Sequence, residues 1–371
     1  TGSLPSMTVT IDDLPLPDSL DSSDPAAADW LAYADIVNGV CRADSGTDMF
    51  DGDPRAWLVH MRDQTHTATR ILAARDDEGR LVGIGLLAYD RTTDNDVNVD
   101  VAVLPENRDA GIEDALEERL ELLAREAGRT NARSYAFVRP EAMPDDEGAI
   151  LRPASGFGGV PRDAGTTGFF LRHGYELGQV ERASAFDLRQ PLDGVCDMLA
   201  RAEEFAGPDY EPVWWQAPTP DHLLDDYARA ITRMSTDIPT GELDMDEERW
   251  DADRVRSRDA RQIESGRVWA VAGVVHRTTG RLVAFNEIAS HPDPTRAAEN
   301  FGTIVLAEHR GHRLGTIVKC LGLLRFHEEV PEAPLVQTFN AEENRFMLDV
   351  NEAVGFRTVC WTGEWQKKLV R

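Results

Sequence analysis

The sequence predicts a protein of the α/β or α+β class with two similar domains, each built on a mixed sheet with flanking helices. Three observations support this prediction. The chain has 371 residues, which is more than a single core of ordinary size accommodates. Strand-like apolar segments alternate with segments in which apolar residues recur every three or four positions. The same four landmarks also occur twice in the same order, and such self-similarity indicates an internal repeat.

The repeat consists of a Gly-Arg-Leu-Val turn before a strand, a second apolar strand running into a turn, a helical pattern, and a Gly-aromatic pair before a last strand. In the first copy these landmarks lie at residues 79–82, 99–104, 112–127 and 174–175. In the second copy they lie at residues 280–283, 302–307, 314–328 and 355–356. The first copy is longer, and its surplus around residues 139–167 is rich in Pro, Gly and acidic residues, which is typical of a surface loop.

The repeat also sets the expected domain boundaries. We expect domain one at residues 7–190 and domain two at residues 191–371, with the break after the last strand-like segment of the first copy. The residues TGSLPS at positions 1–6, before Met7, resemble a cloning remnant.

The bulk composition excludes several classes of protein. Hydrophobic residues at 42% and charged residues at 28% are the values of a globular chain, and no apolar run reaches the roughly 18–20 residues that a membrane span needs. With 66 acidic and 39 basic residues, the net charge of −27 repels nucleic-acid phosphates and attracts cations. We therefore expect no nucleic-acid or membrane partner. The charge serves solubility and favours a cationic substrate.

The cysteines give no sign of a disulfide framework or of a metal site. The four of them lie far apart, at positions 41, 196, 320 and 360. No CxxC pair and no histidine at metal-ligand spacing accompanies them, so we predict no metal. No basic segment followed by an apolar run opens the chain, which favours a cytoplasmic location over secretion.

A basic, glycine-containing turn interrupts this acidic sequence. It reads EHRGHRLGTIVKC over residues 308–320, between an apolar strand and a helical pattern. The free N–H groups of a helix's first turn carry partial positive charge, and glycine lets a ligand approach the backbone closely. Arg310 and Arg313 add charge, so the turn can hold a pyrophosphate. It lacks the spacing of a dinucleotide fingerprint and the Lys-Ser/Thr ending of a nucleotide P-loop.

The turn resembles the acetyl-CoA turn of the GNAT N-acetyltransferase superfamily, whose pattern is Arg/Gln-x-x-Gly-x-Gly/Ala. Arg310 and Gly315 match this pattern, whereas Arg313 replaces the central glycine. The segment NRFMLDVNEAVGF at residues 344–356 is similar to a later helix of the family. With the repeat, the whole chain resembles a tandem GNAT protein, with the two-domain arrangement of mycothiol synthase. This resemblance implies that the mixed sheet of each domain is mostly antiparallel.

The resemblance also implies acetyl-CoA as a co-substrate, bound by domain two. The residues expected to bind it are Val305, Ala307, Arg310, Gly311, His312, Arg313, Leu314, Gly315, Thr316 and Asn344. The turn of domain one reads RDAGIE over residues 108–113, where Asp109 and Glu113 would repel a pyrophosphate. We therefore expect domain one to act as a structural partner or as a wall of the substrate site.

Acetyl transfer to an amine needs a base, and Glu287 is our first candidate for it. It lies in a strand-like segment at residues 282–288, where alternation places it on one face with Val283 and Phe285. The alternative interpretation is a solvent-facing strand residue. Glu299, at the entry to the next strand, is the second candidate for the base.

The departing thiolate needs a proton, which this family commonly obtains from a Tyr four residues before the Gly-aromatic pair. Asn351 occupies this position in the second copy and Phe170 in the first, and neither is a phenol. Asn351 can still hydrogen-bond the sulfur or the substrate, or it can be a structural helix residue. Another group or water would then protonate the thiolate.

The resemblance thus implies an acetyl-CoA-dependent N-acetyltransferase that acts on a small-molecule primary amine, with the working site in domain two. An amino sugar, a polyamine and an amino-acid derivative all fit this description. Two alternatives remain: a CoA-binding regulator without catalysis, and an acyl or aminoacyl transferase of natural-product biosynthesis. Both a monomer and a homodimer are compatible with the sequence, because the tandem copies can pair within one chain.

Overall fold

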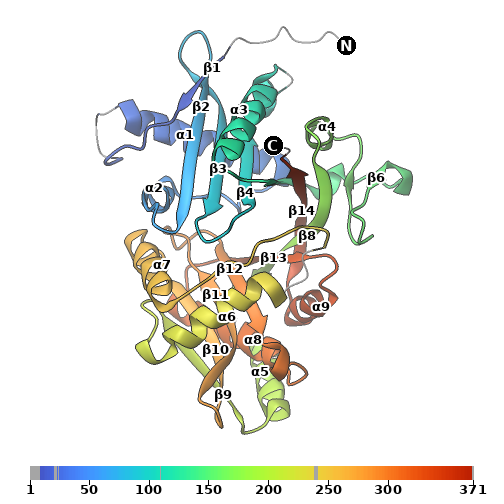
Figure 1. Cartoon of the computed structure of the whole chain (residues 1–371). Coiled ribbons are helices and arrows are strands. Elements are labelled where there is room, and N and C mark those ends of the chain that lie inside the picture. The colour runs from blue at the N-terminus through green and yellow to red at the C-terminus, as the bar shows by residue number, and fades with distance from the viewer. Residues whose placement is uncertain (1–8, 21–22, 24, 109, 238–240, 370–371) are drawn as a thin grey trace. The chain divides into compact units, whose positions relative to one another are not determined.

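The computed structural model describes residues 9–20, 23, 25–108, 110–237 and 241–369. Asp109 of the predicted turn in domain one and residues 1–6 lie outside the described residues. The chain forms two compact units (Figure 1). Unit 1 comprises Thr1–Val180, Gly241–Asp246 and Cys360–Arg371, and unit 2 comprises Glu181–Thr240 and Glu247–Val359.

The sheet of unit 1 has the strand order β1, β2, β3, β4, β5, β14. The strands are β1 Thr10–Asp13, β2 Thr67–Arg75, β3 Leu81–Asp90, β4 Asp96–Ala102, β5 Asn131–Val138 and β14 Arg357–Lys368. Neighbours are antiparallel except β4 and β5, which pair in parallel over residues 96–98 and 131–133. The predicted mixed, mostly antiparallel sheet is therefore present in unit 1.

Helices cover both faces of this sheet, as Figure 1 shows for α1 and α3. The helices of unit 1 are α1 Pro25–Ser45, α2 Pro54–Arg62, α3 Ile112–Glu126 and α4 Gly165–Arg172. Ile71 and Ala73 of β2 pack with α1 and α2, whereas Leu72 and Ala74 of the same strand share a core with α3. Because successive strand residues point to opposite faces, unit 1 has one hydrophobic core on each side of its sheet.

The long loop predicted around residues 139–167 contains a two-stranded sheet of β6 Ile150–Leu151 and β7 Val160–Pro161. Short 3-10 helices occur in both units. They are η1 Pro105–Asn107, η2 Pro140–Ala142, η3 Glu147–Ala149, η4 Asp221–Leu223 and η5 Ala307–His309. Of these, η1 and η5 form the equivalent turns between the strand and the helix of the two copies.

The sheet of unit 2 has the strand order β8, β13, β12, β11, β10, β9. The strands are β8 Glu176–Asp187, β9 Tyr210–Gln216, β10 Trp269–His276, β11 Arg281–Ala289, β12 Ala298–Val305 and β13 Leu335–Ala341. Only β12 and β13 pair in parallel, over residues 298–300 and 336–338, and their neighbours are antiparallel. Unit 2 therefore repeats the strand pattern of unit 1.

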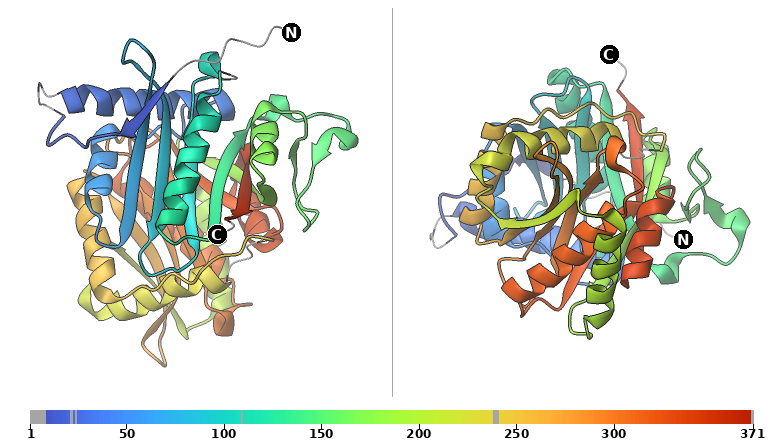
Figure 2. Two further views of the ribbon diagram at one scale, coloured as in Figure 1. Left: turned by 45° about the horizontal axis from the view of Figure 1, so that its top comes forward. Right: turned by 90° about the horizontal axis from the view of Figure 1, so that it is seen from below.

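Unit 2 also has helices on both faces of its sheet. They are α5 Asp193–Ala206, α6 Leu224–Asp237, α7 Ala252–Glu264, α8 Leu314–Glu329 and α9 Arg345–Val354. Figure 2 shows α5 and α8 side by side, and their apolar residues share cores with β10 and β11. α6 and α7 pack on the other face, around Tyr227 and Phe285. The buried face of α8 is thus fixed against the sheet, which orients the helix start at the end of β12.

Segments from one half of the sequence complete the unit of the other half. β13 pairs with residues 181–187 of β8, which come from the first half, and β5 pairs with residues 361–368 of β14, the last strand. Residues 241–246, which lie between α6 and α7 in the sequence, belong to unit 1. The compact units therefore do not follow chain order, and the domain boundaries expected from the repeat stay a prediction.

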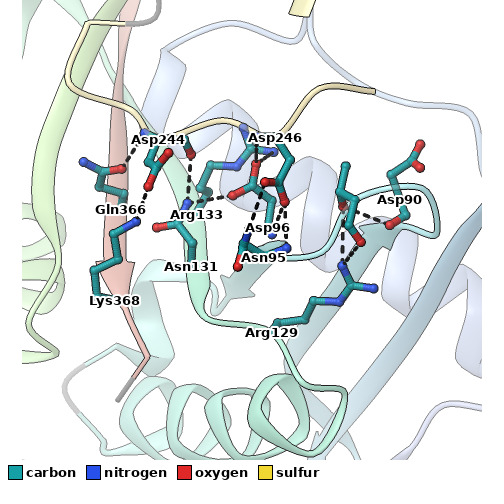
Figure 3. A network of polar contacts seen from close by, with 11 residues as sticks. Asp90, Asn95, Asp96, Arg129, Asn131, Arg133, Asp244, Asp246, Gln366 and Lys368 are labelled. Atoms are coloured by element: carbon teal, nitrogen blue, oxygen red, sulfur yellow. Dashed lines mark hydrogen bonds and ion pairs between the residues drawn. The ribbon is translucent and has the colours of Figure 1, made fainter. Parts of the chain in front are cut away.

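Hydrogen bonds hold residues 241–246 within unit 1, as Figure 3 shows. The Asp246 carboxylate accepts from the Asn95 N–H at 2.7 Å, and the Asp246 N–H donates to Asp96 at 2.8 Å. The side-chain amide of Asn131 donates to the Asp244 carbonyl at 2.9 Å, and Lys368 pairs with the Asp244 carboxylate at 2.6 Å. These contacts attach the segment to β4, β5 and β14.

The predicted class is confirmed, since both units combine a mixed sheet with helices on its two faces. Within the ranges that the structure describes, no helix is both long and apolar enough to cross a membrane.

Candidate active site

A cavity of about 490 Å³ lies in unit 2 where β12, the start of α8 and the start of α9 meet. The parallel pairing of β12 with β13 covers residues 298–300, and the cavity lies beside the rest of β12. Its lining residues are Asp237, Thr303, Ile304, Val305, Arg310, Gly311, Arg313, Leu314, Gly315, Glu343, Asn344, Arg345, Phe346 and Met347. The predicted turn therefore forms one wall of a cavity.

The backbone of the turn orients the start of α8 toward this cavity. Gly311 and Arg313 have φ angles of 86° and 57°, and Arg313 is the only non-glycine residue with positive φ in the part of the chain that the structure describes. Such a conformation costs about 1 kcal/mol for a residue with a Cβ. No side chain caps the start of α8. The strained turn thus presents the uncapped N–H groups and the partial positive charge of the helix start.

Two arginines add full charges to this wall. Arg310 donates from Nε to the Val305 carbonyl at 3.3 Å and from Nη2 to the Asp237 carbonyl at 3.4 Å, which fixes its guanidinium beside the cavity. Its side chain remains 54% exposed, so it can still meet a ligand. Arg313 lies over the ring of Phe205, with its guanidinium carbon 4.3 Å from the ring centroid. With Arg345, the lining holds three arginines against the carboxylates of Asp237 and Glu343, and this excess of positive charge favours an anion.

The structure brings seven of the ten residues expected to bind the cofactor into the lining: Val305, Arg310, Gly311, Arg313, Leu314, Gly315 and Asn344. Ala307, His312 and Thr316 do not belong to the lining. Asn344 caps α9, since its side chain accepts from the Met347 N–H at 3.3 Å. The ring of His312 lies 5.0 Å from that of Tyr210. All ten assignments stay predictions as to ligand binding.

Sequence reasoning missed several residues of the cavity, among them Phe346 and Thr303. Phe346 is 62% exposed, and only the local signal of an aromatic residue just after Asn344 was available to find it. Thr303 lies two residues before Val305, so strand alternation places both side chains on one face of β12. That alternation was the signal for Thr303.

Glu287 is buried, with only 4% of its surface exposed, and it does not face solvent. Its carboxylate accepts hydrogen bonds from the Arg258 guanidinium at 3.0 Å, from the Gly302 N–H at 3.1 Å and from the Tyr227 hydroxyl. The register of β11 and β12 shifts at this point, between Asn286 and Ile288. Through its hydrogen bond with Gly302, Glu287 therefore fixes the irregular part of β12, just before the residues of this strand that line the cavity.

An aromatic box surrounds the arginine that pairs with Glu287. The Arg258 guanidinium lies 5.0 Å from the ring centroid of Tyr227, 5.1 Å from that of Trp250 and 4.7 Å from that of Trp269. Its Nε and Nη2 atoms are buried without a hydrogen-bond partner. Burial raises the pKa of the Tyr227 hydroxyl well above its ordinary value, so Tyr227 stays neutral and donates to Glu287. This arrangement leaves the Glu287 carboxylate engaged with three hydrogen-bond donors.

The other candidates for catalysis lie away from the cavity lining. The side-chain amide of Asn351 donates to Asn340 on β13 at 2.6 Å, and its own oxygen is buried without a hydrogen-bond partner. Glu299 forms an ion pair with Arg267 at 3.5 Å, and burial raises its pKa. Neither residue lines the cavity, and their catalytic roles stay predictions.

A buried lysine that the sequence did not signal lies on α8, outside the cavity lining. Lys319 of α8 is fully buried and donates to the side-chain oxygen of Asn300 at 3.0 Å. Burial lowers its pKa to about 7. The Asn300 amide in turn faces the Thr303 hydroxyl at 3.5 Å, and Thr303 donates to Asn286 at 2.7 Å. A polar chain therefore connects Lys319 with a residue of the cavity lining.

The equivalent turn of unit 1 keeps the shape but not the charge. Gly111 has a φ of 84° and precedes α3, as Arg313 precedes α8. Arg108 forms two hydrogen bonds with the Asp44 carboxylate, at 2.9 and 2.8 Å. Glu113 lies in the first turn of α3. Within the described ranges of either unit, no group of three or more His, Cys, Asp or Glu residues could hold a metal ion.

No family model and no curated protein matches this sequence, whereas several solved structures resemble it over nearly its whole length. A tandem GNAT protein from the clavulanic acid biosynthesis pathway, without AcCoA, has a TM-score of 0.73 at 22% identity, covering 98% of this chain and 99% of that one. A GCN5-related N-acetyltransferase from Sphaerobacter thermophilus has a TM-score of 0.56 at 15% identity, covering 93% and 94%. A glucosamine N-acetyltransferase region of a fungal multi-domain GH3 β-N-acetylglucosaminidase has a TM-score of 0.58 at 14% identity, covering 97% and 38%. The chain therefore has the tandem GNAT fold, as the sequence predicted.

Proposed function

We propose that unit 2 transfers an acetyl group from acetyl-CoA to the primary amine of a small molecule. The observation that supports this most is the cavity at the start of α8, where a basic turn, a helix N-terminus without a side-chain cap and the end of β12 meet. The GNAT fold supports acyl transfer as the class of reaction. The net charge of −27 favours a cationic amine as the substrate.

The residues of the cavity fit the proposed cofactor. A diphosphate carries the charge and the acceptor oxygens that the first N–H groups of α8 and the guanidinium groups of Arg310 and Arg313 complement. A Cβ added to Gly315 would lie 3.7 Å from Val305 and 3.8 Å from Phe346, so glycine keeps the passage between β12 and α9 open. Phe346 offers an exposed ring on the opposite wall.

When bound, acetyl-CoA supplies an activated thioester, and residues of this chain position it for attack. Glu287 accepts hydrogen bonds from three donors, which favours a positioning role for the strand at Gly302 over the role of a free base. Thr303 carries a hydroxyl in the lining, but it donates its single proton to Asn286, so it does not serve as the donor to the thiolate.

Cofactor binding is tested by titration calorimetry of acetyl-CoA into the full chain and into an Arg310→Glu, Arg313→Glu double variant. We expect one site in the wild type, with an affinity at least about 100-fold lower in the double variant, because two charge-assisted contacts become repulsive. An Arg277→Glu, Arg325→Glu double variant is the matched control, since both side chains are exposed and lie outside the lining. Absence of binding to the wild type would reject the acetyltransferase proposal.

Turnover is tested by the release of free CoA thiol with a panel of primary amines. A CoA-binding regulator is the second candidate, because Glu287 is fully engaged and Asn351 lies outside the cavity lining. Such a protein would bind acetyl-CoA but release no thiol with any amine. If Glu287 only positions the strand, Glu287→Gln lowers the rate without changing its pH profile. Loss of the acidic limb of that profile would identify Glu287 as the base instead.

A further inference from the structure

A second cavity, of about 150 Å³, lies in unit 1 where β4 and β5 separate beyond their short parallel pairing. Its walls come from α1, β3, β4, β5, α3 and α4. Most of the lining is apolar or aromatic, including Val37, Ile84, Leu86, Val99, Phe137 and Phe170. Such a cavity suits a small ligand with a hydrocarbon body.

One carboxylate in this lining forms no direct ion pair, although the charge of Arg133 acts on it from a greater distance. Asp100 of β4 accepts from the Ser134 hydroxyl at 3.1 Å and from the Tyr135 N–H. Among the residues that the structure describes, no Arg, Lys or His forms a hydrogen bond or an ion pair with it. Burial raises the pKa of Asp100 to about 7, and the charge of Glu117 adds to this rise, whereas the charge of Arg133 opposes it.

A second carboxylate faces the same cavity from α3. Glu117 is 2% exposed, and it accepts from the Tyr175 hydroxyl at 2.9 Å. Lys367 lies 3.9 Å from Glu117 but 2.7 Å from Glu121, so the lysine belongs mainly to the outer carboxylate. Burial raises the pKa of Glu117 as well. The interior of this cavity is therefore acidic.

The mouth of the cavity is also acidic. Its lining contains Asp44 and Glu113 but a single cation, Arg108, whose guanidinium is held by Asp44. In unit 2 the helix position equivalent to Glu117 is Lys319, so the same position of the helix carries groups of opposite charge type in the two units. An anionic cofactor that fits unit 2 would meet four carboxylates in unit 1.

We propose that the cavity of unit 1 binds a small organic cation, a primary amine with a hydrocarbon body whose ammonium pairs with Asp100. The ammonium gives this carboxylate a direct ion pair with a charge-assisted hydrogen bond. The rings of Tyr33, Tyr135 and Phe137 in the lining bury the hydrocarbon part. This site is distinct from the cavity at the start of α8 in unit 2, and the inference does not depend on the acetyl transfer proposed there.

The test is titration calorimetry of benzylamine, cyclohexylamine and n-hexylamine into the full chain at pH 8, each beside its isosteric alcohol. We expect at least one amine to bind one site per chain, and its alcohol to bind at least about tenfold more weakly, as loss of a charged hydrogen bond implies. Asp100→Asn should weaken the amine by a similar factor. Glu118→Gln, on the exposed face of α3, is the matched control and should change nothing.

Three results would overturn the proposal. One is that no amine of the panel binds the wild type, and another is that Asp100→Asn binds the amine as well as the wild type does. The third uses the Arg310→Glu, Arg313→Glu variant, in which the proposed cofactor site of unit 2 is removed. If acetyl-CoA displaces the amine from this variant, the cavity of unit 1 is a cofactor site; we expect no displacement.

Discussion

The two strand-to-helix turns of this protein have nearly the same backbone and opposite electrostatics. Arg108 donates to the Val103 carbonyl at 3.1 Å, and Arg310 makes the equivalent contact with the Val305 carbonyl at 3.3 Å. In unit 1 the Asp44 carboxylate lies 2.8 Å from the guanidinium, whereas in unit 2 the Asp237 carboxylate lies 3.9 Å away and the guanidinium remains half-exposed. The comparison shows that one backbone geometry can carry different side-chain charges, so the fold of the turn does not by itself decide what the helix start binds.

The carboxylates inside the two units also differ, in the kind of partner that they have. Glu287 in unit 2 has an arginine partner and two further donors, whereas Asp100 in unit 1 has only neutral donors. Lys319 and Glu117 occupy equivalent positions on α8 and α3. A buried charge without a counter-ion destabilises a fold, so such charges are expected where they serve a ligand.

The largest expected effect on acetyl-CoA affinity comes from reversing the charge of one arginine, in each turn separately. Arg310→Glu should weaken acetyl-CoA binding at least about 30-fold, which corresponds to about 2 kcal/mol. Arg108→Glu should leave that affinity unchanged, because Arg108 belongs to the other turn. Calorimetry on both variants checks this. Equal losses would show that both turns contribute to one binding event.

A smaller effect is expected from removing the buried charge of α8. The pKa of Lys319 is lowered to about 7, so the unfolded chain holds more protons between pH 7 and 10.5, and stability rises with pH across this window. Lys319→Met removes this penalty but leaves Asn300 without its donor, and we expect a net stabilisation of about 2 kcal/mol at pH 6. Thermal unfolding at pH 6 and pH 10 should show the gain shrinking at the higher pH. A gain independent of pH would contradict the assigned charge.

In unit 1 we expect stability to change with pH in the opposite direction. The pKa of Asp100 is raised to about 7 from 3.8, so the folded chain holds a proton between these values and stability falls as the pH rises through this window. Asp100→Asn abolishes that loss. Allowing for partial solvent screening, we expect the variant to be about 1 kcal/mol more stable than the wild type at pH 8. At pH 4 the difference should vanish, and a destabilised variant at pH 8 would contradict the inference.

The smallest effect is expected from Arg313→Gly, which removes a charge from the turn of unit 2 and suits its left-handed backbone conformation. Arg313 has the left-handed conformation that Gly111 has in unit 1. Arg313→Gly should relieve strain and change stability by less than about 1 kcal/mol, while weakening acetyl-CoA about fivefold through the lost charge. Unfolding and calorimetry measure the two effects. A collapse of stability would show that the Arg313–Phe205 contact holds the turn.

Local features of the site could be predicted from the sequence because they depend on neighbouring residues. The turn at Arg310–Gly315 follows from an apolar strand, two glycines and a helical pattern within one short segment. The environment of Glu287 could not be predicted, since Tyr227 and Arg258 come from two helices that precede it in the sequence. Asp100 was missed for a similar reason, because only the separation of β4 from β5 opens a cavity beside it.

The sequence by itself determined the class of fold, the repeat and the basic turn, since each depends on hydrophobic periodicity or on conformational preferences over a few residues. Only the tertiary structure decided which strand completes each sheet and which buried charge has a partner. β8 and β14 complete sheets across the two halves of the sequence. Strand pairing and charge compensation depend on contacts between distant segments, and such contacts form only when the whole chain packs.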